Sequence, residues 1–220
     1  MNMKNIQVYI RSLADLLELS VQDFANRAEY QAYKKNKIYQ YRDELISKFL
    51  HVPISKLQYA IAEQGKPYLL DHPLQFNHSH SQNDYALALS LNVQDLGVDI
   101  ESLDRKIRFE ALAQHAFHPQ EYQCWKALGE DINYWFKVWT TKEALLKAHG
   151  MGIRLDLNTL NTQMHPTHDN GQIIDERLGV FAYQCFDLGH AMLSVAWRSG
   201  MGCGQFILPN IQIINMNKTN

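Results

Sequence analysis

The chain has 220 residues, enough for one large domain or two small ones, and its 46% hydrophobic and 20% charged residues are ordinary for a globular protein. A net charge of −2 gives no sign of nucleic-acid binding, and three scattered cysteines argue against a disulfide framework or a zinc–thiolate site and favour a reducing compartment. Without a signal-peptide pattern or an apolar run near the ~20 residues of a membrane span, we expect a cytoplasmic protein that makes no membrane contact.

Apolar spacing and turn residues predict the elements of the first half of the chain. In chain order they are a strand at 6–10, a helix at 21–49, a strand at 57–62, a turn at 65–67, a polar loop at 76–81, and strands at 85–91 and 96–100. The helix is expected to end before Pro53. Its candidate core residues are Tyr39, Leu45, Ile46, Phe49 and Leu50.

The second half of the chain is predicted to alternate in the same way. It contains candidate helices at 109–117, from Pro119 onward and at 135–149, then strands at 178–186 and 191–197. In each half a polar, histidine-containing segment precedes an apolar strand. This weak repeat suggests two similar α/β halves, which we place at residues 1–105 and 106–220, the latter ending in a polar tail.

Asp99 and Glu101 lie two residues apart in a β-branched setting. Alternate side chains of a strand share a face, so both carboxylates point one way while Val98 and Ile100 point into a core. For an isolated pair of this kind, the simplest explanation is a strand end with a solvated face. The second acidic segment, which contains Glu143 and Lys147, favours a functional explanation instead.

Glu143 and Lys147 are four residues apart and therefore neighbours on the predicted helix. An exposed ion pair of this type contributes only about 0.2–0.5 kcal/mol. The helix also carries Trp139 and several apolar residues, so it must be well buried, and Glu143 is expected to face a cleft.

These four side chains suit a divalent cation that holds a diphosphate. Magnesium prefers oxygen ligands and bridges substrate phosphates. Asp99, Glu101 and Glu143 would supply a partial shell, and Lys147 would meet a phosphate oxygen as a point charge.

At this point the sequence resembles a known family. Five ordered segments between residues 65 and 153 are similar to the signature of the 4'-phosphopantetheinyl transferases, in their longer, surfactin-synthetase-activating subtype. They are Gly65–Leu69 (GKPYL), Phe76–Ser81 (FNHSHS), Gly97–Glu101 (GVDIE), Trp139–Lys147 (WTTKEALLK) and Gly150–Ile153 (GMGI).

The resemblance implies an α+β fold of two pseudo-symmetric halves. Each half would be a small, mainly antiparallel sheet packed with helices, and coenzyme A would bind in the cleft between them. The implied enzyme is a monomer that uses Mg²⁺ to move the phosphopantetheine arm of coenzyme A onto a serine of an apo acyl or peptidyl carrier protein. The by-product would be adenosine 3',5'-bisphosphate.

The resemblance also implies roles for individual residues. Asp99, Glu101 and Glu143 fall on metal ligands, and Glu143 and Lys147 on catalytic positions. Contacts to coenzyme A are implied for Arg42, Lys66, Ser79, His80 and Lys147, with Lys34, Lys35 and Lys37 as weaker candidates for its 3'-phosphate. Glu121 falls on the proposed general base, for which a metal-bound water is the alternative.

Carrier proteins usually present an acidic helix around their serine, so the partner surface should be basic and apolar. Candidates are Arg105, Lys106, Arg108, Leu112, Ala113 and Phe117. A solvated linker followed by a core helix would explain the same residues. Two other functions stay open, a non-catalytic module that binds carrier protein or coenzyme A and a magnesium-dependent nucleotide hydrolase.

Overall fold

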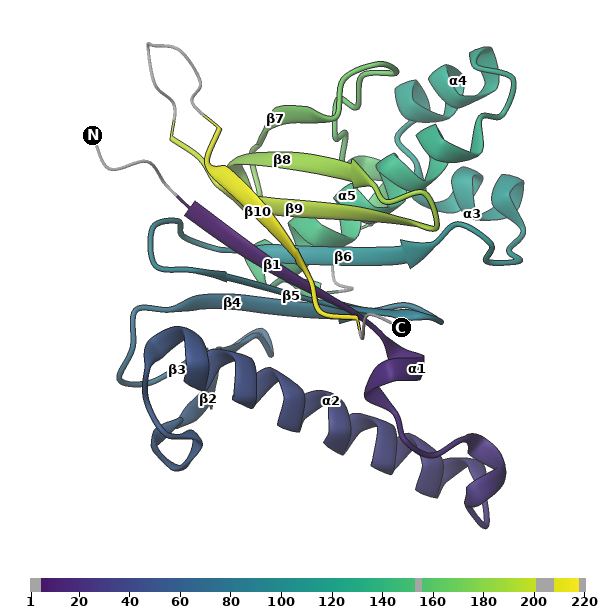
Figure 1. Cartoon of the computed structure of the whole chain (residues 1–220). Coiled ribbons are helices and arrows are strands. Elements are labelled where there is room, and N and C mark those ends of the chain that lie inside the picture. The colour runs from purple at the N-terminus through teal and green to yellow at the C-terminus, as the bar shows by residue number, and fades with distance from the viewer. Residues whose placement is uncertain (1–4, 153–155, 201–207, 218–220) are drawn as a thin grey trace.

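Two four-stranded sheets form the centre of the molecule (Figure 1). The computed structural model describes residues 5–152, 156–200 and 208–217. The first sheet has the order β10-β1-β5-β4, made of β1 (Asn5–Ser12), β4 (Gln75–His80), β5 (Asp84–Ser90) and β10 (Asn210–Asn215). The second has the order β6-β9-β8-β7, made of β6 (Gly97–Ser102), β7 (Asn170–Asp175), β8 (Gly179–Asp187) and β9 (Ala191–Arg198).

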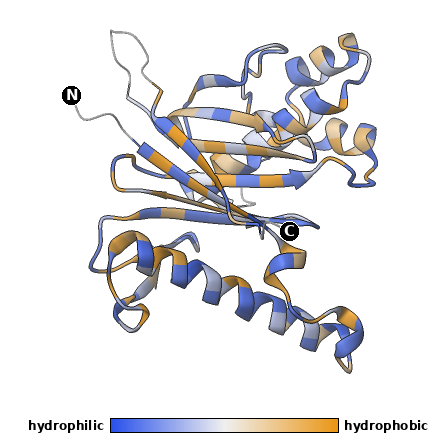
Figure 2. Cartoon of the chain, in the orientation of Figure 1, coloured by the Kyte–Doolittle hydropathy of each residue, from blue (hydrophilic) through white to orange (hydrophobic). Residues whose placement is uncertain are grey.

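The helices of the described residues are α1 (Leu13–Leu16), α2 (Arg27–Leu50), α3 (Phe109–Ala116), α4 (Pro119–Ala127) and α5 (Ile132–His149). Helices α2 and α5 pack on the two sheets, α3 and α4 contact α5, and α1 follows β1. Short 3₁₀ turns lie at Val21–Asp23, Ile54–Lys56 and Leu157–Thr159, and a small ladder pairs β2 (Tyr59–Ile61) with β3 (Pro67–Leu69). The largely hydrophilic α2 packs one apolar stripe on the first sheet, and α5 packs on the second (Figure 2).

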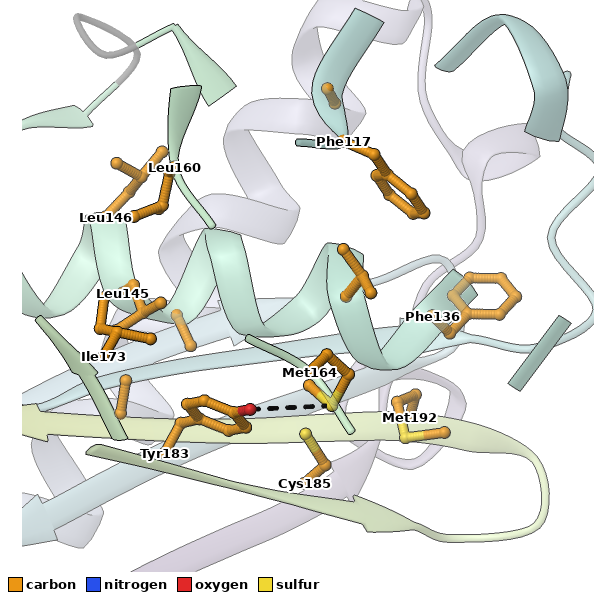
Figure 3. Packing of buried hydrophobic residues seen from close by; sticks show 14 of the residues in the cluster. Phe117, Phe136, Leu145, Leu146, Leu160, Met164, Ile173, Tyr183, Cys185 and Met192 are labelled. Carbon is orange, nitrogen blue, oxygen red and sulfur yellow. Dashed lines mark hydrogen bonds between the residues drawn. The ribbon is translucent and has the colours of Figure 1, made fainter. Parts of the chain in front are cut away.

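Burial of apolar side chains holds these layers together. One cluster, which includes Val8, Ile100 and Val195, fills the space between the two sheets. A second joins α5 to the second sheet, where Leu145, Ile173 and Tyr183 meet (Figure 3).

The α+β class with mainly antiparallel sheets is confirmed, because the β1–β10 pair is the one parallel pairing among the described strands. Two strands cross the predicted boundary between the halves, because β6 joins the second sheet and β10 joins the first. The division at residues 105 and 106 stays a prediction. Among the described residues, no helix is both long and apolar enough to span a membrane.

Several local predictions were wrong. Residues 76–81 are not a loop, because Gln75–His80 pairs antiparallel with β5 as strand β4. The long helix begins at Arg27, where Asn26 caps it by accepting a hydrogen bond from the Glu29 amide. Tyr39 is 39% exposed and not a core residue. The polar tail, predicted at residues 215–220, begins later than that, since Asn215 still belongs to β10. Cys203 and Ile153 lie outside the described residues.

Candidate active site between the two sheets

Polar side chains at alternate positions of β4 and the residue after it join the first sheet to β6 of the second. The amide of Val98 donates to Asn77 Oδ1 at 2.9 Å, and Ser79 Oγ donates to Asp99 Oδ1 at 2.8 Å. Ser81 Oγ lies 3.0 Å from Ser102 Oγ. Because side chains of a strand alternate between faces, the Asn-x-Ser-x-Ser pattern presents all three groups to β6. The segment predicted as a loop therefore anchors the site.

Asp99, Lys147 and Ser79 meet at the junction of β6, α5 and β4. Lys147 Nζ lies 2.5 Å from Asp99 Oδ1 and 2.8 Å from Ser79 Oγ. The Asp99 side chain is only 5% exposed, whereas that of Lys147 is 30% exposed. The other oxygen, Asp99 Oδ2, is buried and has no hydrogen-bond partner in the described structure. A buried, unpaired carboxylate oxygen is costly, and it marks a place where a donor or a cation would be stabilising.

Gly97 lets α5 approach β6 closely enough for this meeting. A Cβ at Gly97 would clash with the carbonyl oxygen of Ala144 and the amide nitrogen of Ala148, both on the backbone of α5. The helix itself is fixed at both ends, by Asp131, which accepts from the Tyr134 amide at 2.6 Å, and by Gly150, a left-handed cap at φ 90°. The glycine of the GVDIE segment is therefore a packing requirement, which the sequence pattern alone did not reveal.

Glu101 and Glu143 lie in the same electrostatic environment as Asp99. Burial raises the pKa of Glu101, and the neighbouring Asp99 charge raises it further. Burial and Asp99 likewise raise the pKa of Glu143. The structure therefore brings the three predicted carboxylates near one another, with the oxygen donors that a hard divalent cation prefers. As the side chains stand, however, no three His, Cys, Asp or Glu groups of the described residues converge tightly enough to hold a metal ion.

Protein cations hold two of these carboxylates. Lys147 pairs with Asp99, and Arg105 Nη1 lies 2.7 Å from Glu101 Oε1. Trp139 Nε1 donates to the same Glu101 oxygen at 3.3 Å. Neither Arg105 nor Trp139 was predicted as a partner of Glu101.

Two further basic residues, Lys34 on α2 and His80 at the end of β4, lie close enough for their charges to interact. Burial lowers the pKa of His80, and the positive charges of Lys34 and, less strongly, Lys147 lower it further. Burial also lowers the pKa of Lys34. Lys34 is thus near His80, whereas Lys37 pairs with Glu18 at 3.3 Å. A hollow of about 250 Å³ next to Lys147 is lined by Lys66, His78 and Gly150 among others.

Lys66 braces the turn before β3 against the end of α5. Its Nζ donates to the carbonyl of Leu96 at 3.0 Å and to that of Ala148 at 2.6 Å. Burial lowers the pKa of Lys66 to about 8. The residue lines the hollow beside Lys147 and a neighbouring one of about 330 Å³, but its ammonium already has two backbone partners.

The Arg42 side chain, on α2, packs between aromatic rings. It is 7% exposed, and its guanidinium lies 4.6 Å from the ring centre of Tyr39 and 4.4 Å from that of Tyr59. Its Nη2 pairs with Asp43 Oδ1 at 2.8 Å. These contacts give Arg42 a packing role, and the structure does not bring it to the Asp99 group as an unpaired cation.

Glu121 lies outside the carboxylate group. It is 2% exposed and pairs through Oε2 with Lys142 at 2.8 Å. Its Oε1 accepts from the amide and hydroxyl of Thr162 at 2.7 and 2.6 Å, and its Oε2 accepts from the His118 amide at 2.8 Å. Lys142 also donates to the carbonyls of Leu157 and Leu160. The residue expected as a general base is therefore embedded in a buried network.

His78 fills a position between α2 and the first sheet, with its ring 5.9 Å from that of Tyr39 and 5.8 Å from that of Tyr85. Burial lowers its pKa from 6.5 to about 3. At pH values between about 3 and 6.5, His78 binds a proton in the unfolded chain but not in the folded chain. The free energy of unfolding must therefore fall as the pH drops from 6.5 towards 3.

Replacing His78 with phenylalanine is expected to remove this part of the acid sensitivity, because phenylalanine cannot bind the proton. The measurement is urea unfolding of both proteins between about pH 7 and about pH 4. His115→Gln, at an exposed position of α3, is the matched control and should keep the wild-type pH dependence. An unchanged slope in His78→Phe would assign the acid sensitivity to other groups.

Comparison with known proteins finds similarity in the segment that contains Asp99, Glu143 and Lys147. Residues 95–191 match the model of the 4'-phosphopantetheinyl transferase superfamily. The chain is 34% identical over 129 residues to the 4'-phosphopantetheinyl transferase HetI of Nostoc sp., covering 56% of this chain and 54% of the relative. It is 30% identical over 132 residues to the transferase Sfp of Bacillus subtilis, covering 59% and 56%.

A third relative is AcpT of Escherichia coli K12, 36% identical over 101 residues, with 44% of this chain and 50% of the relative covered. The chain spans about half the length of these curated relatives. The family resemblance drawn from the five segments is confirmed for the matched region. The segment that positions Asp99 against Lys147 is thus similar to the 4'-phosphopantetheinyl transferase superfamily.

Proposed function

We propose that the protein transfers the 4'-phosphopantetheine arm of coenzyme A to a serine of an apo acyl or peptidyl carrier protein. The observation that carries this proposal is the meeting of Asp99, Lys147 and Ser79 within 2.8 Å of one another, on elements from both sheets. Carboxylates and cations side by side suit a diphosphate held with a metal ion. The names of the relatives agree with this chemistry.

The donor set fits a divalent cation such as Mg²⁺. Asp99 offers a buried oxygen that has no partner among the described residues, and Glu101 and Glu143 lie close enough for Asp99 to raise their pKa values. Asp99, Glu101 and Glu143 would hold the ion once Lys147 and Arg105 yield the oxygens that they now contact. When bound, the ion would neutralise negative charge on the diphosphate.

Coenzyme A would lie along the cationic side of the site. Lys147 on α5 and Lys34 on α2 supply positive charge, and His80 on β4 would contribute as a neutral hydrogen-bonding group because its pKa is lowered. The hollow of about 250 Å³ beside Lys147 is open to a ligand. Lys66 would contribute by fixing the wall of that hollow. Arg42 would contribute by packing, since its charge is already paired with Asp43.

In the reaction, the serine oxygen of the carrier attacks the phosphorus nearest the pantetheine, and the bond to the bridging oxygen breaks. Lys147 is placed to neutralise or protonate the leaving phosphate, because its ammonium is partly exposed beside Asp99. Positioning would account for much of the rate, since no covalent enzyme intermediate is built. The serine proton would pass to a water molecule at the site, because Glu121 can accept it only after giving up its pair with Lys142.

The carrier would dock on the basic segment that follows β6. Lys106, Arg108 and His115 line an open hollow of about 730 Å³ together with Ile107 and Leu112. A mixed basic and apolar surface complements an acidic, amphipathic helix.

The direct test is incubation of the protein with coenzyme A, Mg²⁺ and a panel of apo carriers, followed by mass spectrometry of the carriers. The expected result is a carrier heavier by one phosphopantetheine arm. Binding of carrier or coenzyme A without any mass gain would favour the non-catalytic module. Phosphate release from nucleotides without a carrier would favour the hydrolase.

Lys34→Ala is expected to raise the KM for coenzyme A about tenfold and to leave kcat nearly unchanged, because a charge-assisted contact to a phosphate contributes about 1.5–3 kcal/mol. Steady-state transfer kinetics measure the effect. Lys37→Ala, one turn further along α2, removes a lysine that pairs with the exposed Glu18 and should keep the wild-type KM. Equal KM values in the two variants would remove Lys34 from the proposed phosphate contacts.

A further inference from the structure

Arg105 connects the carboxylate group to the basic segment after β6. Its guanidinium pairs with Glu101 Oε1, yet its side chain is 39% exposed, whereas that of Glu101 is 15% exposed. The Arg105 amide donates to the carbonyl of Ser102 at 3.2 Å, so the main chain at this point is fixed by a turn at the end of β6. The side chain can therefore move into solvent without rearrangement of the strand.

The residues that follow Arg105 form the proposed docking hollow. Lys106, Ile107 and Arg108 line it directly, and α3 completes it with Leu112 and His115. An acidic partner seated there would bring negative charge within reach of the neighbouring Arg105. The same guanidinium thus lies between two sources of negative charge, Glu101 and the docked partner.

We propose that Arg105 exchanges partners during the reaction. In the free protein it neutralises Glu101, and it turns to an acidic carrier protein in the hollow when Glu101 takes up a divalent cation. This inference rests on the proposed transferase function. Two positive groups on one carboxylate repel each other, so the cation and Arg105 compete for Glu101. A carrier that draws Arg105 away must then tighten cation binding, and by linkage the cation must tighten carrier binding to the same extent.

The test measures Mn²⁺ affinity of the whole purified protein by electron paramagnetic resonance, without coenzyme A. Arg105→Gln is expected to bind Mn²⁺ about fivefold tighter than wild type, since the competing charge is gone. Adding the apo form of an acyl carrier protein should tighten Mn²⁺ binding to wild type by a similar factor. The same addition should leave Arg105→Gln unchanged, while Arg105→Lys should stay close to wild type because it keeps the charge.

Lys106→Gln is the matched control for general electrostatics, because it removes the adjacent positive charge but leaves the pair with Glu101 intact. Equal gains in Lys106→Gln and Arg105→Gln would overturn the inference, as would equal Mn²⁺ affinities of wild type and Arg105→Gln or no Mn²⁺ binding at all. Mass spectrometry of the carrier distinguishes failure of the Arg105 role from failure of the transferase function. Transfer without the Mn²⁺ pattern contradicts the role of Arg105 alone, and the Mn²⁺ pattern without transfer to any carrier contradicts the transferase function.

Discussion

Asp99→Asn is expected to lower the transfer rate by about two to three orders of magnitude while the fold persists. The asparagine oxygen can still accept the hydrogen bond from Ser79, so the contact between β4 and β6 survives. The negative charge that pairs with Lys147 and would hold the cation is lost. Asp99→Ala and Glu143→Ala are expected to abolish transfer. The measurement is the initial rate of carrier modification, with circular dichroism to confirm folding.

Asp84→Asn provides the matched control for Asp99→Asn. Asp84 is also a buried aspartate, at 3% exposure, but it pairs with His190 at the β8–β9 turn and lies outside the carboxylate group. This variant should modify carriers at close to the wild-type rate. If Asp99→Asn also kept that rate, Asp99 would have no part in holding the diphosphate.

Glu121→Gln is expected to destabilise the protein by about 3–5 kcal/mol, because removing one partner of a buried ion pair leaves the other charge uncompensated. The side chain of Lys142 is 0% exposed and its pair with Glu121 is broken in this variant. The measurement is urea unfolding at neutral pH. The double variant Glu121→Gln/Lys142→Met should recover much of the loss, because the buried charge is removed with its partner.

The control for Glu121→Gln is Glu110→Gln, which removes an exposed carboxylate that contacts Tyr122 and Lys126. Water screens exposed ion pairs such as this one, so the stability of the variant should change little. Activity per folded molecule distinguishes a catalytic role of Glu121 as general base from a structural role. A Glu121→Gln protein that is as stable as wild type but inactive would restore the general-base assignment and contradict the structural one.

The sequence predicts those parts of the site whose residues lie close together along the chain. The β-branched strand around Asp99 and the helix that carries Glu143 and Lys147 each have a clear period, and the structure brings the three residues near one another. The pairing of Arg105 with Glu101 could have been suspected from opposite charges four residues apart, but the turn that brings them together has no strong signal. Asn77 was missed because β4 has the polar composition of a loop. Its polar side chains form hydrogen bonds with the neighbouring sheet, which the sequence does not reveal.

Residues whose roles depend on long-range packing were harder to assign. Glu121 is only two residues into α4, and nothing in its local sequence indicates that Lys142 and Thr162 close around it. Arg42 lies in a basic stretch, yet Tyr39 and Tyr59 enclose its guanidinium. In both cases the sequence supplies the charge, and the tertiary structure decides whether that charge remains available to a ligand.

The pairing of β10 with β1 has a consequence for biosynthesis. Six residues of each strand lie in parallel register, from Asn5 opposite Asn210 to Ile10 opposite Asn215, and Asn217 accepts from the Ser12 amide at 2.6 Å. While the ribosome is still adding residue 209, β1 has one free edge. The first sheet can therefore be completed only after residues 210–215 have been made, and contacts over such a separation form slowly. A nascent chain stalled before β10 would expose a strand edge open to aggregation or to chaperone binding.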